Sequence, residues 1–153
     1  KTASLISSCC KIAAVSVTQQ KEIIESVSNI GENIGIAFQI KDDLFDYGKR
    51  KIGKPRGIDI KEKKLTLPLI YTLNEVDKKK RKWLINSIKK YNKDKSRVKE
   101  IISLVKDTGG LDYAIEKMNY YHRTALDDLK NLPNNEFKES LIHMINYVIE
   151  RDF

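Results

Sequence analysis

Apolar side chains recur every three or four positions along most of the chain, which is the spacing of one face of an α-helix. The pattern predicts a helix over residues 1–29 that is interrupted near Thr18, and a second helix over residues 31–47. No segment shows the strict alternation of a β-strand. The sequence therefore predicts an all-α fold, with further helices over residues 65–75, 77–91, 94–107, 111–132 and 136–151.

The last two of these helices have the clearest apolar stripes. Each stripe predicts the face that a helix buries against its neighbours. In residues 111–132 the stripe consists of Leu111, Ala114, Ile115, Met118, Tyr121, Ala125 and Leu129. In the last helix the side chains expected to be buried are Phe137, Leu141, Met144, Ile145 and Val148.

Residues 48–64 have no helical period and form the longest predicted loop. A loop of this length in a compact domain is generally functional or disordered. Its first part places basic side chains among glycines, an arrangement in which a loop can fold over a phosphate group. These residues are Lys49, Arg50, Lys51, Lys54 and Arg56, around Gly48, Gly53 and Gly57.

The helix before this loop combines an acidic stripe with an otherwise apolar surface. On a helical wheel its polar and small residues fall within an arc of about 100°. They are Glu32, Gly35, Gln39, Asp42, Asp43 and Asp46. A solvated acidic face is one interpretation, but it leaves a large apolar remainder that must cover most of the helix. The favoured interpretation is a buried helix whose carboxylates line a cavity.

Such a cavity points to a particular chemistry. Carboxylate oxygens without histidine or cysteine favour Mg²⁺ or a similarly hard cation over zinc. Mg²⁺ in proteins is usually shared between one or two carboxylates, several waters and substrate phosphates. The stripe and the basic loop together therefore predict a magnesium site for a phosphorylated ligand.

Composition and charge are those of a soluble globular protein, with 41% hydrophobic and 33% charged residues. The net charge of +8, much of it in residues 77–95, indicates a general preference for polyanions. Nucleic acid, phosphorylated metabolites and an anionic membrane surface are all candidates, and solvated helix faces are the simpler alternative. No apolar run approaches the roughly 20 residues that cross a bilayer. Stable membrane insertion is therefore not expected.

The adjacent cysteines Cys9 and Cys10 give information on the redox state of the cellular compartment. Neighbouring cysteines rarely form a disulfide with each other, because the geometry strains the intervening peptide. We expect them to be core thiols in a reducing cytoplasm.

Residues 38–68, FQIKDDLFDYGKRKIGKPRGIDIKEKKLTLP, resemble the second half of the trans-isoprenyl (polyprenyl) diphosphate synthases. The matching elements are FQxxDDxxD at residues 38–46, GKPxGxD at 53–59 and KxTLP at 64–68. Lys1-Thr2 resembles the Lys-Thr pair that precedes this region in the family. The C-terminal helices, ending in VIERDF, resemble those of bacterial long-chain, octaprenyl-type members. The resemblance implies that the chain is part of the isoprenoid synthase helical bundle.

The resemblance implies how the polar end of a substrate is bound. Asp42, Asp43 and Asp46 match the second aspartate-rich motif, which binds Mg²⁺ and so holds an allylic diphosphate. Lys1 and Lys54 match lysines that contact that diphosphate. The implied cofactor is Mg²⁺, and the implied substrates are an allylic diphosphate and isopentenyl diphosphate.

Three further residues match family positions near the reacting carbon atoms. Thr2 and Gln39 match groups beside the developing allylic cation, and Phe38 matches a residue near the homoallylic substrate. The implied reaction is a 1′-4 head-to-tail condensation. One departure from the family pattern lies at Lys63, where glycine is common before the KxTLP lysine.

A larger departure is that the family's first aspartate-rich motif is not present in residues 1–153. The sequence also opens directly in an apolar helix. We therefore expect residues 1–153 to be the C-terminal portion of a prenyltransferase that is inactive in isolation and homodimeric when intact. The alternatives are a non-catalytic accessory subunit or binding module of the same fold and, least favoured, a basic nucleic-acid binder. Nucleic acid is not an expected partner.

Overall fold

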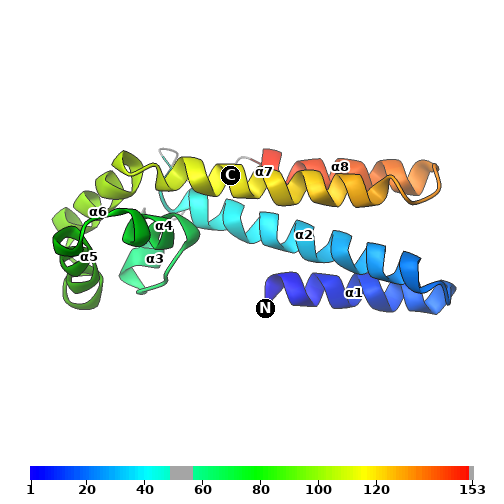
Figure 1. Cartoon of the computed structure of the whole chain (residues 1–153), viewed down its shortest axis with the longest axis horizontal. Helices are drawn as coiled ribbons and strands as arrows, with labels where there is room; N and C mark the ends of the chain where they lie inside the picture. The colour runs from blue at the N-terminus through cyan, green and yellow to red at the C-terminus, as the bar shows by residue number, and fades with distance from the viewer. Residues whose placement is uncertain (49–56, 152–153) are drawn as a thin grey trace. The chain divides into compact units, whose positions relative to one another are not determined.

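The protein is all-helical, as the sequence predicts. The computed structural model describes residues 1–48 and 57–151, and these contain eight helices and no β-strand (Figure 1). The helices are α1 (Thr2–Val17), α2 (Lys21–Phe45), α3 (Ile58–Lys61), α4 (Leu67–Glu75), α5 (Lys78–Lys90), α6 (Lys95–Asp107), α7 (Gly110–Leu129) and α8 (Glu136–Glu150). None of them, within the described residues, is long and apolar enough to cross a membrane.

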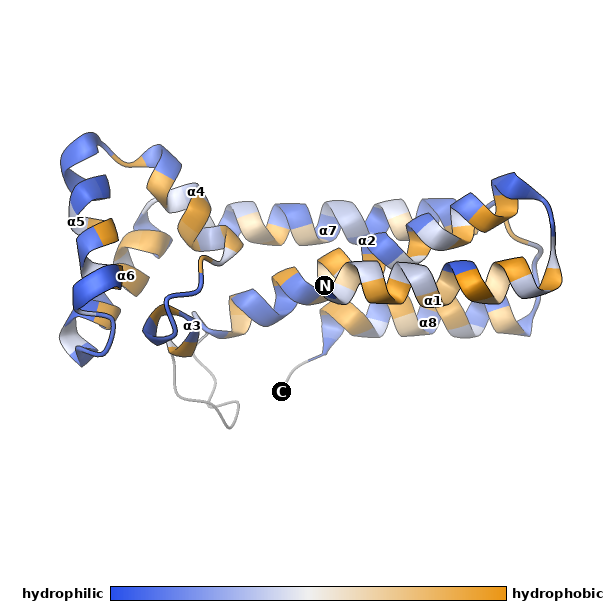
Figure 2. Ribbon diagram, turned by 90° about the horizontal axis from the view of Figure 1, so that it is seen from below, coloured by the Kyte–Doolittle hydropathy of each residue, from blue (hydrophilic) through white to orange (hydrophobic). Residues whose placement is uncertain are grey.

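The chain forms two compact units. The first comprises Lys1–Lys41 and Lys117–Phe153, and the second comprises Asp42–Glu116. Helices α2 and α7 contribute residues to both units. The first unit contains α1 beside α2, with α7 beside α8, as long rods (Figures 1 and 2). Its core is a cluster of buried side chains from α2, α7 and α8: Ile30, Ile34, Ala125, Leu129 and Ile145.

Two glycines of α2 allow α1 to approach it closely. A Cβ atom added to Gly35 would lie 2.5 Å from the Cα of Ala3, and one added to Gly31 would lie 2.8 Å from the Sγ of Cys10. Real Cβ atoms do not come this close to their neighbours, so a larger residue would push the helices apart. The absence of side chains at these positions therefore sets the separation of α1 and α2.

The second unit has its own core, formed mainly by α4, α5 and α6. Its buried side chains are Tyr47, Ile60, Leu69, Leu84, Ile88, Val98, Ile101 and Val105. Aspartate caps fix where its helices begin. The side chain of Asp77 accepts a hydrogen bond from Lys80 N, and that of Asp94 accepts from Ser96 N and Arg97 N. Such caps satisfy N–H groups that have no partner within the helix.

The helix bounds differ from the sequence prediction around α2. The interruption near Thr18 is confirmed, since this residue is extended, but α2 begins at Lys21 instead of residue 31. It also ends at Phe45 instead of residue 47, because Tyr47 N and Gly48 N bond to Leu44 O and Phe45 O three residues back. Helix α3 lies inside the segment that was predicted as loop, and its four residues are too few to show a period.

The predicted burial of α8 is wrong for most of the residues named. Ile145 is buried, whereas Phe137 is 72% exposed and Met144 is 51% exposed. The prediction of core thiols is also wrong, because Cys9 is exposed and Cys10 is half-buried. Apolar periodicity identifies a face that can be buried, but a neighbouring element must be present to cover it. No described residue covers these side chains fully.

Candidate functional site

Two of the predicted catalytic residues meet in the first unit. Thr2 Oγ1 donates a hydrogen bond to Gln39 Oε1 over 3.2 Å, although 37 positions separate them in the chain. Lys1 occupies the N-cap position of α1, where its side chain makes no capping bond and is exposed. The close α1–α2 approach at Gly35, one helical turn from Gln39, makes the Thr2–Gln39 bond possible. The structure therefore pairs the Lys-Thr element with the glutamine of FQxxDDxxD.

Phe38 is held by the C-terminal end of α8. The guanidinium carbon of Arg151 lies 3.9 Å from the centroid of the Phe38 ring, a cation–π contact. Arg151 Nη2 also donates to Phe38 O over 3.3 Å, and its Nε donates to Val148 O over 3.1 Å. Arg151 is only 8% exposed. The predicted substrate-binding phenylalanine is therefore fixed by a buried cation.

A second cation joins the same two helices. Lys41 Nζ donates to Ile149 O over 2.6 Å, at the end of α8 where main-chain carbonyls lack partners within the helix. The sequence analysis missed both Arg151 and Lys41. The one signal for Arg151 was its place in the VIERDF ending, and the resemblance assigned no role to this residue. Contacts between positions more than 100 residues apart leave no local pattern in the sequence.

In the second unit, Asp46 closes the loop that follows α2. Its main-chain oxygen accepts from Gly57 N over 3.2 Å, and its Oδ1 accepts from Ile58 N over 2.7 Å. The other carboxylate oxygen, Oδ2, is buried and has no hydrogen-bond partner among the described residues. Burial raises the pKa of this carboxyl group, and the carboxylate of Asp59 raises it further, while N–H donation from α3 opposes the shift.

Asp43 and Tyr47 hold the start of α4, which is the TLP part of KxTLP. Asp43 Oδ2 accepts from Leu67 N over 3.3 Å, and the hydroxyls of Tyr47 and Thr66 are hydrogen-bonded at 2.6 Å. Tyr47 is buried, and burial raises the pKa of its hydroxyl. Motifs that the sequence shows as separate are therefore joined by direct hydrogen bonds.

Asp42 and Lys54 are the remaining predicted site residues. Asp42 is half-buried at the end of α2. Lys54 and the basic residues around it lie outside the described residues. At the other end of the loop, Lys64 Nζ lies 3.1 Å from Asp59 Oδ1 and 2.7 Å from Glu62 Oε2. This lysine is therefore engaged within its own segment.

The donors fit part of a magnesium site. Among the residues that the structure describes, no group of three or more His, Cys, Asp or Glu side chains could hold a metal ion together. Asp46 nevertheless has a buried carboxylate oxygen without a partner, and Asp42 and Asp43 add further carboxylates on α2. Mg²⁺ needs only one or two protein carboxylates when phosphates and waters complete its shell. The three aspartates therefore fit part of a site in which phosphates and waters supply the other Mg²⁺ ligands.

His122 has a structural partner. Its Nε2 lies 3.0 Å from Asn146 Oδ1, which links α7 to α8. The contact therefore gives this histidine a structural role between the two helices.

Comparison with known proteins places the whole chain in one family. The sequence profile of the family "Polyprenyl synthetase" matches residues 1–105. The geranylfarnesyl diphosphate synthase of Aeropyrum pernix is 35% identical over 155 residues, and the match spans 99% of this chain and 48% of that protein. The chloroplastic solanesyl-diphosphate synthase 2 of Oryza sativa is 32% identical, spanning 99% of this chain and 37% of that protein. The chain belongs to the polyprenyl synthetase family.

Solved structures agree. The geranylgeranyl pyrophosphate synthetase of Pyrococcus horikoshii superposes with a TM-score of 0.90 at 33% identity, covering 99% of this chain and 46% of that one. The geranylgeranyl pyrophosphate synthase of Bacteroides thetaiotaomicron superposes with a TM-score of 0.88 at 38% identity, covering 99% of this chain and 50% of that one. The fold is therefore that of the isoprenoid synthases, and the chain spans about half or less of the relatives that it matches.

Proposed function

We propose that this chain is the C-terminal portion of a polyprenyl diphosphate synthase that condenses isopentenyl diphosphate with an allylic diphosphate. The observation that carries the proposal is the joining of the family motifs. Asp46 and Asp43 accept hydrogen bonds from the main-chain N–H groups of residues 58 and 67, which lie within GKPxGxD and KxTLP. Membership of the polyprenyl synthetase family supports the same activity.

In this proposal the polar end of the substrate lies against the aspartates and lysines. Asp42, Asp43 and Asp46 hold Mg²⁺, and Lys1 and Lys54 bind the diphosphate of the allylic substrate. When bound, Mg²⁺ neutralises the negative charge that develops on the departing diphosphate. The lysines add positive charge on the same group, which lowers the energy of the transition state.

The hydrocarbon chemistry takes place beside Thr2, Gln39 and Phe38. The C–O bond of the allylic diphosphate breaks, and diphosphate leaves with the electron pair. The double bond of isopentenyl diphosphate attacks the resulting allylic carbon, and loss of a proton forms the new double bond. Oxygen dipoles of Thr2 and Gln39 stabilise the positive charge on the allylic carbon. The bond between them orients both dipoles.

Activity requires the rest of the synthase. The family's first aspartate-rich motif does not occur in residues 1–153. We therefore propose that the isolated chain does not turn over substrate and that the intact enzyme is a homodimer. We further propose that the synthase is a bacterial long-chain, octaprenyl-type member, because the C-terminal helices resemble those of such members. Chromatography of the products of the intact enzyme measures the chain length directly.

The test begins with the intact mass of the native protein and the reading frame ahead of Lys1, where a second DDxxD motif is expected. Turnover is then measured with isopentenyl diphosphate, an allylic starter and Mg²⁺, for the chain alone and for the complete protein. We expect product from the complete protein alone. Asp42→Ala should lower its turnover by at least about 100-fold, the scale of lost electrostatic stabilisation.

The matched control is Asp127→Ala, which removes an exposed carboxylate paired with Lys130 on α7. It should leave turnover unchanged. Turnover by the isolated chain would refute the proposal that activity requires the rest of the synthase. A folded complete protein that binds allylic diphosphate without forming product would instead support the accessory-subunit alternative.

A further inference from the structure

The net charge of the protein is concentrated in one helical hairpin. Residues 77–107, which form α5 and α6, contain twelve Lys and Arg against four Asp and Glu, a net charge of +8. This equals the net charge of the whole chain, so the remaining residues are neutral in sum. The hairpin lies wholly within the second unit. Charge this localised is a feature of one surface and not a general property of the protein.

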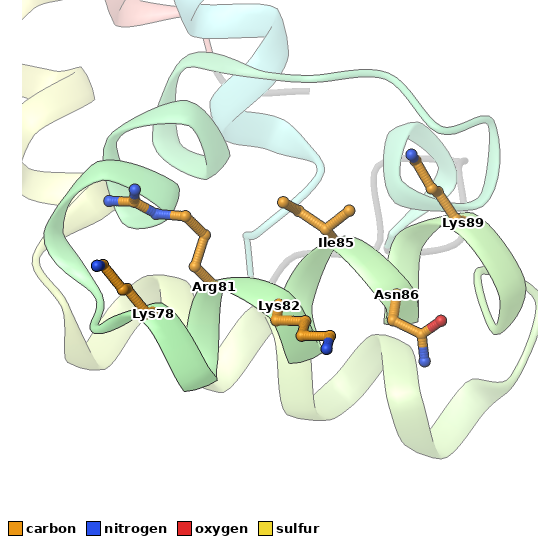
Figure 3. A pocket seen from close by; sticks show the side chains of 6 residues that line it. All are labelled: Lys78, Arg81, Lys82, Ile85, Asn86 and Lys89. Atoms are coloured by element: carbon orange, nitrogen blue, oxygen red, sulfur yellow. The ribbon is translucent and has the colours of Figure 1, made fainter.

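Helix α5 forms the centre of this basic surface. It carries seven basic residues and no acidic one, and all seven are exposed. One side of the helix borders a shallow depression of about 380 Å³, and Figure 3 shows the side chains that line it. They are Lys78, Arg81, Lys82, Ile85, Asn86 and Lys89. None of the α5 lysines forms an ion pair with a carboxylate among the described residues.

The arrangement of these charges is unfavourable for the helix itself. Five basic residues in succession, at positions 78–82, occupy the first turns of α5, where the helix dipole is already positive. Lys78 and Lys82 are also four positions apart on one face, where like charges repel. The Asp77 carboxylate at the N-cap offsets part of this repulsion, but it is a single negative charge against five positive ones. An external anionic surface would remove the conflict.

The side chains present favour a lipid surface over nucleic acid. Arg81 is the one arginine of α5, and its guanidinium is engaged by Leu73 O and Asn74 O, at 2.6 and 3.0 Å. The aromatic rings of Trp83 and Tyr91 both lie against Arg97, at 5.2 and 5.6 Å. The Arg81 guanidinium and the two rings are therefore already engaged within the protein, although Tyr91 is 47% exposed, whereas nucleic acids are bound by free bidentate arginines and stacking rings.

What α5 offers instead is lysine point charges around an exposed aliphatic side chain. Ile85 is 40% exposed and lies between Lys82 and Lys89 on the depression side. Lysines attracted to anionic headgroups, with an apolar residue that can enter the acyl boundary, are the features of an interfacial helix. We propose that α5 docks the protein on the surface of an anionic phospholipid membrane.

The proposal rests on the charge and exposure of α5 and does not require the condensation activity. If the proposed function is correct, docking would place the enzyme where its product partitions, because a long polyprenyl chain is insoluble in water. Failure of one proposal can be told apart from failure of the other, since vesicle binding is measured without substrate and turnover is measured without vesicles.

The experiment is sedimentation of the chain with large vesicles at about 0.1 M salt, where charges still act over about 10 Å. Vesicles of phosphatidylcholine with phosphatidylglycerol are compared with vesicles of phosphatidylcholine alone. We expect binding to the anionic vesicles, weakening as salt rises. The variant K78Q/K82Q/K89Q should bind roughly 100-fold more weakly, from about fivefold for each lysine.

The matched control is K11Q/K21Q/R123Q, which removes the same charge from exposed positions of the first unit. It should retain nearly full vesicle binding. Ile85→Ser keeps every charge and should lower vesicle binding while leaving binding to a single-stranded oligonucleotide unchanged. Equal losses in the two triple variants would overturn the proposal. So would oligonucleotide binding tighter than vesicle binding and lost in the α5 variant.

Discussion

At the scale of single residues, the turn between α3 and α4 contains one backbone conformation that does not suit its side chain. Lys63 has φ = 59° and is the one non-glycine residue with positive φ in the described structure. The family commonly has glycine here, so the sequence already marked the position. The turn keeps the conformation that glycine adopts freely, and Lys63 bears its steric cost.

Lys63→Gly should therefore stabilise the protein. Relief of the left-handed conformation is worth about 1–2 kcal/mol, and the greater freedom of glycine in the unfolded chain offsets part of it. We expect a net gain of about 0.5–1 kcal/mol in the free energy of unfolding, measured by urea denaturation. Lys63→Ala is the control, since it removes the same charge but keeps Cβ. Equal gains in both variants would assign the effect to charge.

Asp46 has a structural role beside the metal-binding role proposed for it. The sequence suggested a metal ligand, and the structure shows that Oδ1 and the main-chain oxygen close the loop while Oδ2 remains without a partner among the described residues. The raised pKa of this carboxyl follows from its burial. A substitution at Asp46 therefore affects both the segment that ends at α3 and any cation held by Oδ2.

At the scale of elements, the pairing of α1 with α2 places Thr2 against Gln39. The contact depends on helices that approach at two glycines, and Ser7 also hydrogen-bonds to Ser28 between the same two helices. Glycine in a helix interior is unfavourable by roughly 1 kcal/mol relative to alanine. Its presence at Gly35 is explained by the Cα of Ala3, which leaves no room for a side chain.

Gly35→Ala tests whether the higher helix propensity of alanine or the close contact with α1 dominates. Because the added Cβ meets main-chain atoms that cannot rotate away, we expect the helices to separate and the free energy of unfolding to fall by about 1–3 kcal/mol. The measurement is chemical denaturation followed by circular dichroism. Gly48→Ala is the control, since among the residues that the structure describes its added Cβ meets nothing nearer than Phe45 O at 3.4 Å. A gain in stability for Gly35→Ala would show that propensity outweighs the close contact.

At the scale of the whole molecule, α1 has apolar residues on both sides. One side packs on α2, while Leu5, Ile12, Val15 and Val17 are 66%, 69%, 55% and 84% exposed. Figure 2 shows hydrophobic residues along much of this helix. Exposed apolar side chains grouped on one helix mark a contact surface. The occupant that follows from the proposed function is the remaining half of the synthase, since the chain spans about half of its relatives.

Leu5→Lys with Ile12→Lys should therefore improve the behaviour of the isolated chain. We expect less concentration-dependent association in analytical ultracentrifugation and little change in stability, because both side chains are already exposed. The same pair should lower the turnover of the complete synthase. Phe137→Lys, at a site 72% exposed outside α1, is the control and should affect neither measurement. Unchanged turnover in the double variant would mean that this face is not covered in the intact enzyme.

The sequence by itself determined most of the local structure and the family, and it suggested the chemistry. Helical periodicity predicted most of the helices, because their patterns depend on neighbours three and four positions away. The break at Thr18 was also predictable. The motif residues indicated a family, and the family assignment is confirmed by the profile match over residues 1–105. Carboxylates without histidine or cysteine partners suggested Mg²⁺, which stays a prediction.

Only the tertiary structure decided which residues meet and which side chains are covered. The Arg151–Phe38 contact joins positions 113 residues apart, and the bonds from Asp46 and Asp43 join segments across the loop. No local pattern encodes such pairs, because they depend on how whole helices pack. For the same reason, periodicity identified the apolar residues of α8 but could not show that Phe137 and Met144 are exposed. Whether a face is buried depends on the element that packs against it.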